Sequence, residues 1–102
     1  MSEATERHRH SLTLAAYSLV SLRVAAAFLD VKVETIKLMI SEGELPAIPV
    51  RKRFKIDPLD LAVLVLASKA GITPTEFWAR HGDDTPAHAR LYIDHIRKFQ
   101  GK

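Results

Sequence analysis

The spacing of apolar residues predicts a short helix that begins after Ser21. Within residues 22–30 apolar side chains recur at the three- and four-residue intervals of one helix face, at Leu22, Ala25, Ala26 and Leu29. Ser21 precedes them in the position of an N-cap, where a hydroxyl accepts a hydrogen bond from the first turn. Asp30 then interrupts the pattern.

A second helix is predicted for VETIKLMISE, residues 33–42. Its buried face consists of Ile36, Met39 and Ile40, and Gly43 follows where a left-handed residue ends a helix. Two short helices joined by a very short turn have the layout of a helix-turn-helix.

The pattern changes to that of strands after Glu44. Residues 45–50 and 54–56 read as extended segments, which predicts a β-hairpin with Arg51, Lys52 and Arg53 at its tip. The first segment contains Pro46 and Pro49, which fit only an edge strand. Phe54 is expected to point inward and to anchor the hairpin against the helices.

A third helix is predicted from Asp57-Pro58 to Gly71. Aspartate fits the cap position, proline fits the first helical position, and the helix is apolar on most of its circumference. Such a helix is covered by more than one neighbour.

Two further helices are predicted beyond Gly71. Residues 73–76 have the spacing of a capping box and precede Phe77-Trp78. A last helix begins at Thr85-Pro86 and reaches about Phe99. Its apolar stripe is expected to contain Leu91, Tyr92, Ile96 and Phe99.

Composition narrows the function classes. The chain has 102 residues, 47% of them hydrophobic and 26% charged, which indicates a small globular protein. It contains no cysteine, so disulfides, cysteine-bound zinc and thiol catalysis are excluded. The N-terminus lacks the pattern of a signal peptide, and no apolar run is long enough for a membrane span. We therefore expect a cytoplasmic protein without a membrane partner.

Outside the hairpin, the sequence gives only weak signals for metal binding, base stacking or catalysis. His81, His88 and His95 could form a metal site with Asp83 and Asp84 on paper. His88 and His95 lie two turns apart on one helix face, too far for one zinc ion, so no metal or cofactor is expected. Phe77 and Trp78 are expected in the core or in an interface rather than as a platform for base stacking. No nucleophile–base pair or phosphate-binding glycine loop is present, so we expect a protein that is not an enzyme.

The net charge of +3 is small, but four basic residues are clustered in VRKRFKID, and this local concentration is what indicates an anionic partner. Alone, a basic hairpin tip is more often a solvated loop than a contact for nucleic acid. Its place after a helix-turn-helix reverses that preference.

Residues 20–64 resemble the excisionase-type, MerR-like winged helix-turn-helix. VSLRVAAAFLDV is similar to the first helix and turn, VETIKLMISEGELPAI to the second helix and the approach to the wing, VRKRFKID to the wing, and PLDLAVL to the third helix. The family usually has glycine where this chain has Asp30 and Arg51. The second helix also departs from the family, because its start carries only one basic residue, Lys32.

The resemblance implies that the second helix enters the major groove of double-stranded DNA. The residues that would face DNA there are Lys32, Val33, Thr35 and Lys37. Glu34 would repel phosphate unless it accepts a hydrogen bond from a cytosine amino group. Leu38 is expected to contact a second protomer or the C-terminal helices.

The wing would supply most of the electrostatic attraction. Its cations Arg51, Lys52, Arg53 and Lys55 would contact the backbone or a narrow minor groove. Arg23, in the first turn of the first helix, would touch a phosphate or pair with Asp30 or Glu34.

The predicted fold is mainly α with a small β-hairpin wing, a winged helix-turn-helix followed by C-terminal helices. We expect a flexible tail at 1–16, a DNA-binding domain at 17–70 and a helical extension at 71–102. The extension either completes the core or forms a dimer interface.

The expected function is non-enzymatic DNA binding, as an excisionase (a recombination directionality factor) or a small transcriptional regulator of a mobile element. Its partners would be an integrase or recombinase, or the transcription machinery, and it would act as a homo-oligomer or a cooperative array on DNA. The alternative is an antitoxin- or adaptor-like module whose C-terminal helices bind another protein.

Overall fold

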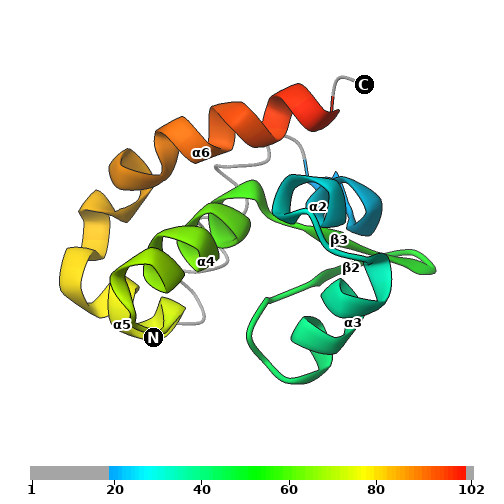
Figure 1. Cartoon of the computed structure of the whole chain (residues 1–102), viewed down its shortest axis with the longest axis horizontal. Coiled ribbons are helices and arrows are strands. Elements are labelled where there is room, and N and C mark those ends of the chain that lie inside the picture. The colour runs from blue at the N-terminus through cyan, green and yellow to red at the C-terminus, as the bar shows by residue number, and fades with distance from the viewer. Residues whose placement is uncertain (1–18, 101–102) are drawn as a thin grey trace.

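The structure is a computed structural model that describes residues 19–100, so the predicted tail at 1–16 lies outside the described residues. The described chain is mainly helical and has one small three-stranded antiparallel sheet (Figure 1). The expected combination of helices with a β-hairpin is confirmed at this level.

The first predicted helix is α2, Leu22–Leu29. The Ser21 hydroxyl accepts a hydrogen bond from the Val24 amide at 3.1 Å, so the predicted cap is present. Asp30 ends the helix in the left-handed conformation, with φ 59° and ψ 48°. Aspartate tolerates this conformation better than most residues, which explains how the turn accommodates a residue other than glycine.

The second helix, α3, covers Val33–Ser41 and follows α2 after a turn of three residues, 30–32. It packs on α2 through Ile36, which is completely buried. Gly43 follows the helix with φ 81°, a left-handed conformation that glycine adopts without steric cost. The predicted pair of helices and its short turn are confirmed.

The hairpin consists of β2, Ile48–Val50, and β3, Arg53–Ile56. Val50 pairs with Arg53, so the turn contains only Arg51 and Lys52. The predicted tip is therefore one residue shorter than expected, because Arg53 is already part of β3.

A third strand, β1, at Val20–Ser21, pairs with the other edge of β3 and was not predicted. The strand order is β1-β3-β2, so β2 with Pro49 lies at an edge, as the prolines required. Pairing on both sides holds the base of β3 to the body of the molecule.

The remaining helices also begin and end at the predicted signals. Asp57 Oδ1 accepts a hydrogen bond from the Leu59 amide at 2.9 Å, and Gly71 ends that helix with φ 73°. Thr73 and Glu76 form the predicted reciprocal capping box. The elements are α4 at Pro58–Ala70, α5 at Pro74–His81, the 3₁₀ helix η2 at Gly82–Asp84 and α6 at Thr85–Gln100.

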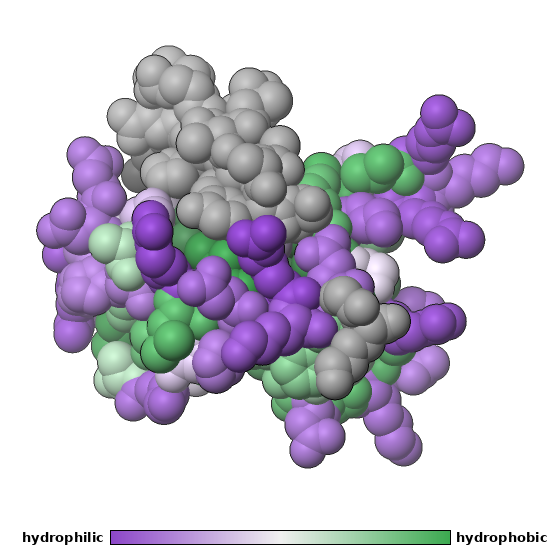
Figure 2. Space-filling model, turned by 90° about the horizontal axis from the view of Figure 1, so that it is seen from above, coloured by the Kyte–Doolittle hydropathy of each residue, from purple (hydrophilic) through white to green (hydrophobic). Residues whose placement is uncertain are grey.

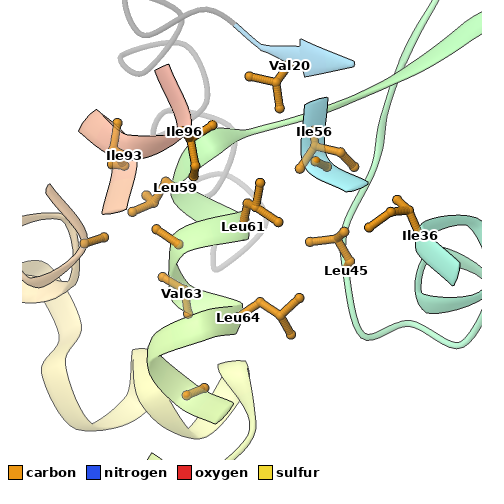
Figure 3. Packing of buried hydrophobic residues seen from close by; sticks show 14 of the residues in the cluster. Val20, Ile36, Leu45, Ile56, Leu59, Leu61, Val63, Leu64, Ile93 and Ile96 are labelled. Carbon is orange, nitrogen blue, oxygen red and sulfur yellow. The ribbon is translucent and has the colours of Figure 1, made fainter. Parts of the chain in front are cut away.

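One hydrophobic cluster connects these elements, with α4 at its centre (Figure 3). Leu59 of α4 lies beside Ile96 of α6, whereas Leu61 points to the other side of α4, toward Ile56 and Leu45, which extend the cluster toward α3. α6 runs along α4 and also packs on α2 (Figure 1). The C-terminal helices contribute Phe77, Ala89, Ile93 and Ile96 to this cluster, and their expected use as a dimer interface stays a prediction.

The predicted apolar stripe of α6 is partly wrong. Its buried residues are Thr85, Ala89, Ile93 and Ile96, whereas Leu91 is 63% exposed. Leu91 is two residues from both Ala89 and Ile93 and therefore lies on the opposite side of the helix. Phe99 is also mainly outside the core, although its ring meets that of Phe28 edge to face.

Candidate nucleic-acid interface

The hairpin tip presents three adjacent cations to solvent. Arg51, Lys52 and Arg53 are all exposed, and within residues 19–100 none of them has an ion-pair partner. The hairpin projects from the body of the molecule (Figure 1), and hydrophilic side chains extend from the same end in Figure 2. Because β3 continues into the buried Ile56, the position of these charges is fixed by the core.

Arg51 occupies an unusual backbone conformation for an arginine. Its φ is 60°, whereas Lys52, the second residue of the turn, does not have a positive φ. A positive φ at the first turn position alone is the pattern of a type II′ turn, which normally has glycine there. The structure thus keeps a charged side chain where backbone geometry favours glycine.

Phe54 does not point into the core, so the prediction that it anchors the hairpin is wrong. It is 51% exposed and pairs with Pro49. Phe54 and Ile56 share one face of β3, because side chains two residues apart point the same way. Ile56, two residues nearer the base, belongs to the core and performs the anchoring, whereas Phe54 lies outside the core cluster.

Lys55 differs from the tip cations in its surroundings. It lies at the middle of the sheet, paired with Ile48 on one side and Ser21 on the other, and is half-buried. It therefore belongs to the base of the hairpin. Arg53 shares its face of β3 and continues this line of charge to the tip.

The four predicted contacts of α3 do not share one face. Val33 is half-buried against the core, and Lys32 precedes the helix as its N-cap residue. Thr35 and Lys37 are exposed, but they adjoin the buried Ile36 on either side and point to opposite flanks of the helix. Val33 is thus only partly available at the surface, because it also packs against the core.

The side chains opposite Ile36 are those of Glu34, Leu38 and Ser41, which we call the α3 outer face. At 100° per residue these positions lie within about 40° of the outward direction. All are exposed, with Leu38 at 54%. A helical projection centred on Ile36 predicts that these three side chains point outward. The outer face could therefore have been identified from the sequence, although the family resemblance pointed to other residues.

Leu38 does not contact the C-terminal helices, which corrects one of its two expected roles. α6 lies across α2 and α4, on the far side of α2 from α3 (Figure 1). The Leu38 carbonyl accepts a hydrogen bond from the Ser41 hydroxyl at 2.8 Å. The hydroxyl proton of Ser41 is therefore already used within the helix.

Arg23 is exposed in the first turn of α2. Among residues 19–100 it forms no ion pair with either Asp30 or Glu34, the two partners considered for it. Its guanidinium is thus available to an anion from outside the described chain.

The histidines of the C-terminal helices are part of an aromatic contact. The His81 ring lies 4.3 Å from the Phe77 ring and 4.3 Å from the His88 ring, between centroids. Phe77 is buried, as predicted, and Trp78 is half-buried. In the part of the chain that the structure describes, no three histidine, aspartate or glutamate side chains gather as metal ligands would.

No helix among the described residues has the length and apolar character needed to cross a membrane. Comparisons with protein-family models, with curated proteins and with solved structures found no match to this chain.

Proposed function

We propose that this protein is a non-enzymatic, sequence-selective DNA-binding protein with a winged helix-turn-helix. In this proposal α3 enters the major groove and the β2–β3 hairpin is the wing, which grips the backbone or the minor groove. The observation that carries it is the cluster of Arg51, Lys52 and Arg53, exposed and without ion-pair partners within residues 19–100. The core fixes the cluster beside a pair of helices joined by a short turn.

The physical basis is counterion release. A cation that neutralises a phosphate lowers the slope of log K against log salt by about 0.9. Arg51 to Arg53 would contribute about 2.7 together, and Arg23 and Lys55 would add to this if the duplex reaches them. A fixed tip also gives up less side-chain and loop entropy on binding than a mobile basic tail.

The test is a titration of mixed-sequence duplex DNA at several salt concentrations. The variant is Arg51→Ala, Lys52→Ala and Arg53→Ala together. A matched control removes three exposed cations from α6, Arg90, Arg97 and Lys98, and so changes the net charge equally. We expect the hairpin variant to bind weakly with a slope shallower by about 2.7, and the control to stay near the wild type.

Two results would reject the proposal. One is the absence of binding by the wild type at low salt. The other is an equal loss in both variants, which would mean that only the net charge attracts DNA. Thermal melting of each variant shows whether the fold is intact.

Within this function we propose an excisionase, or otherwise a small transcriptional regulator, of a mobile element. A single reading head contacts few bases, so either role needs several copies on DNA, as a homo-oligomer or a cooperative array. Footprinting separates them. Direct repeats beside a recombination site indicate an excisionase that positions an integrase, and one inverted repeat at a promoter indicates a regulator.

A second candidate is an antitoxin- or adaptor-like module that binds a protein through the C-terminal helices. The exposed Leu91 of α6 favours it, whereas Ile96 is completely buried and cannot be a contact. This function predicts that Leu91→Lys abolishes activity in cells and that the hairpin variant retains it. DNA binding predicts the reverse ranking.

A further inference from the structure

We propose that the α3 outer face selects cytosine and thymine in the major groove, with Glu34 reading cytosine and Leu38 reading thymine. This inference rests on the DNA-binding function proposed above. It assigns specificity to residues other than Lys32, Val33, Thr35 and Lys37, because the outward direction of the helix belongs to Glu34 and Leu38.

The geometry of α3 makes these two side chains the first to meet a groove floor. Ile36 is completely buried on the inner side, so the helix has one fixed orientation relative to α2. Glu34 and Leu38 are four residues apart, about 6 Å along the helix axis, and lie one above the other. With bases stacked at about 3.4 Å, the two side chains would span adjacent or next-adjacent base pairs.

A carboxylate at this position discriminates among base edges. It only accepts hydrogen bonds, and Glu34 is exposed without an ion-pair partner inside residues 19–100. Guanine offers two acceptors in the major groove, thymine one acceptor and a methyl group, and adenine an acceptor beside its amino group. Cytosine alone offers a donor without an acceptor of its own, so Glu34 favours cytosine.

Leu38 adds an apolar requirement at the same face. It is 54% exposed, and the thymine methyl is the one apolar group that a base presents in the major groove. Ser41, the third member of the face, donates its hydroxyl proton to the Leu38 carbonyl and has none to offer a base. The contacts of the outer face are therefore one carboxylate and one apolar side chain.

The negative charge of the α3 outer face and the positive charges of the hairpin would have different effects on DNA binding. Glu34 repels phosphate and reduces binding to any duplex that places no cytosine amino group opposite it. The hairpin cations attract every duplex equally. Affinity would thus come from the hairpin and discrimination from the outer face.

The first experiment selects binding sites from a random duplex pool with the full chain. We expect enriched sites to contain cytosine and thymine at adjacent or next-adjacent positions of one strand. Glu34→Gln should replace the cytosine by adenine, because an amide side chain pairs with adenine in the major groove. Glu44→Gln is the matched control, since it removes an equal charge from an exposed residue outside the helix and should leave the selected sequence unchanged.

The second experiment replaces the selected thymine by uracil, which removes only the methyl group. We expect the wild type to bind the uracil duplex about fourfold more weakly, the value of one buried methyl group. Leu38→Ala should bind both duplexes equally. Both substitutions are at exposed positions, so melting temperatures should stay close to that of the wild type.

The outcomes separate this inference from the proposed function. Hairpin-dependent binding without any base preference, or a preference unchanged in Glu34→Gln and Leu38→Ala, would overturn the inference and leave DNA binding intact. An equal effect of Glu44→Gln would also overturn it. If Leu38→Ala instead dissolves a self-association of the protein, the outer face is a protein contact. Absence of DNA binding would reject both proposals together.

Discussion

At the scale of single residues, Arg51 combines strain with charge. Its φ of 60° costs a non-glycine residue about 1 kcal/mol, while its guanidinium is part of the exposed cation cluster. We expect Arg51→Gly to raise the free energy of unfolding by up to about 1 kcal/mol, the extra freedom of glycine in the unfolded chain opposing part of the gain. The same variant should bind DNA with a salt slope shallower by about 0.9.

Arg51→Ala is the matched control for this prediction. It removes the same charge but keeps a Cβ at a positive φ, so it should lose DNA affinity without gaining stability. Chemical denaturation and salt-dependent titration of both variants measure the two effects independently. Equal stability of the glycine and alanine variants would show that the turn relaxes without strain.

Thr85 is a second single residue whose contribution to the free energy of unfolding can be predicted. It is completely buried where η2 meets α6, and its hydroxyl has no hydrogen-bond partner in the described chain. Valine has nearly the same shape without the hydroxyl, so Thr85→Val should raise the free energy of unfolding by about 1 kcal/mol. Thr85→Ser keeps the hydroxyl, loses a buried methyl and should lower it by about 1 kcal/mol. A less stable valine variant would contradict this assignment.

At the scale of elements, the capping box of α5 predicts a dependence of stability on pH. Hydrogen bonds from the Thr73 backbone amide and then from its side chain hold the pKa of Glu76 below its usual value. The folded pKa is thus lower than the unfolded one. The stabilisation is complete above the unfolded pKa and is lost as pH falls through the folded pKa.

Denaturation of the wild type and of Glu76→Gln across the acid range tests this. The difference in stability between them should shrink as the pH falls below the ordinary range of glutamate. Glu44→Gln, at an exposed glutamate that caps no helix, should show a smaller dependence on pH. A wild-type advantage that persists unchanged in acid would mean that the carboxylate charge does not stabilise the cap.

The elements also show which features the sequence determines locally. Helix starts at Ser21, Asp57 and Thr73 were predictable because a cap depends on residues within one turn. The third strand, β1, was not, because its two residues gain strand character only by pairing with the distant Ile56 and Lys55. The same holds for Phe54, whose exposure depends on where the helical body ends.

In the candidate interface, too, some features could be predicted from nearby sequence and others depended on the tertiary structure. The tip cations follow from their clustering together with their place after a predicted helix-turn-helix, and the structure places all three in solvent. The α3 contacts follow from a family resemblance rather than from the helical projection, which puts Val33 on the inner flank of α3, where it is half-buried. A helical projection around the buried Ile36 predicts which α3 side chains are exposed without any family pattern.

At the scale of the whole molecule, α6 determines whether the chain unfolds as one unit. It packs on both α4 and α2, and therefore joins the region predicted as an extension, 71–102, to the helices at 17–70. Ile96 is completely buried at this junction, so Ile96→Ala should lower the free energy of unfolding by about 2–5 kcal/mol. Helicity and Trp78 fluorescence should still report one coincident transition.

The control for this prediction lies on the same helix. Leu91 is 63% exposed, and Leu91→Ala should change stability by less than about 0.5 kcal/mol. Two separate transitions, or a loss of α6 alone in the Ile96 variant, would mean that residues 71–102 fold independently. A single transition has a consequence for the interface, because α2 supports α3. Destabilising Ile96 should then weaken DNA binding only as far as the folded fraction falls, and saturating DNA should raise the melting temperature of the variant.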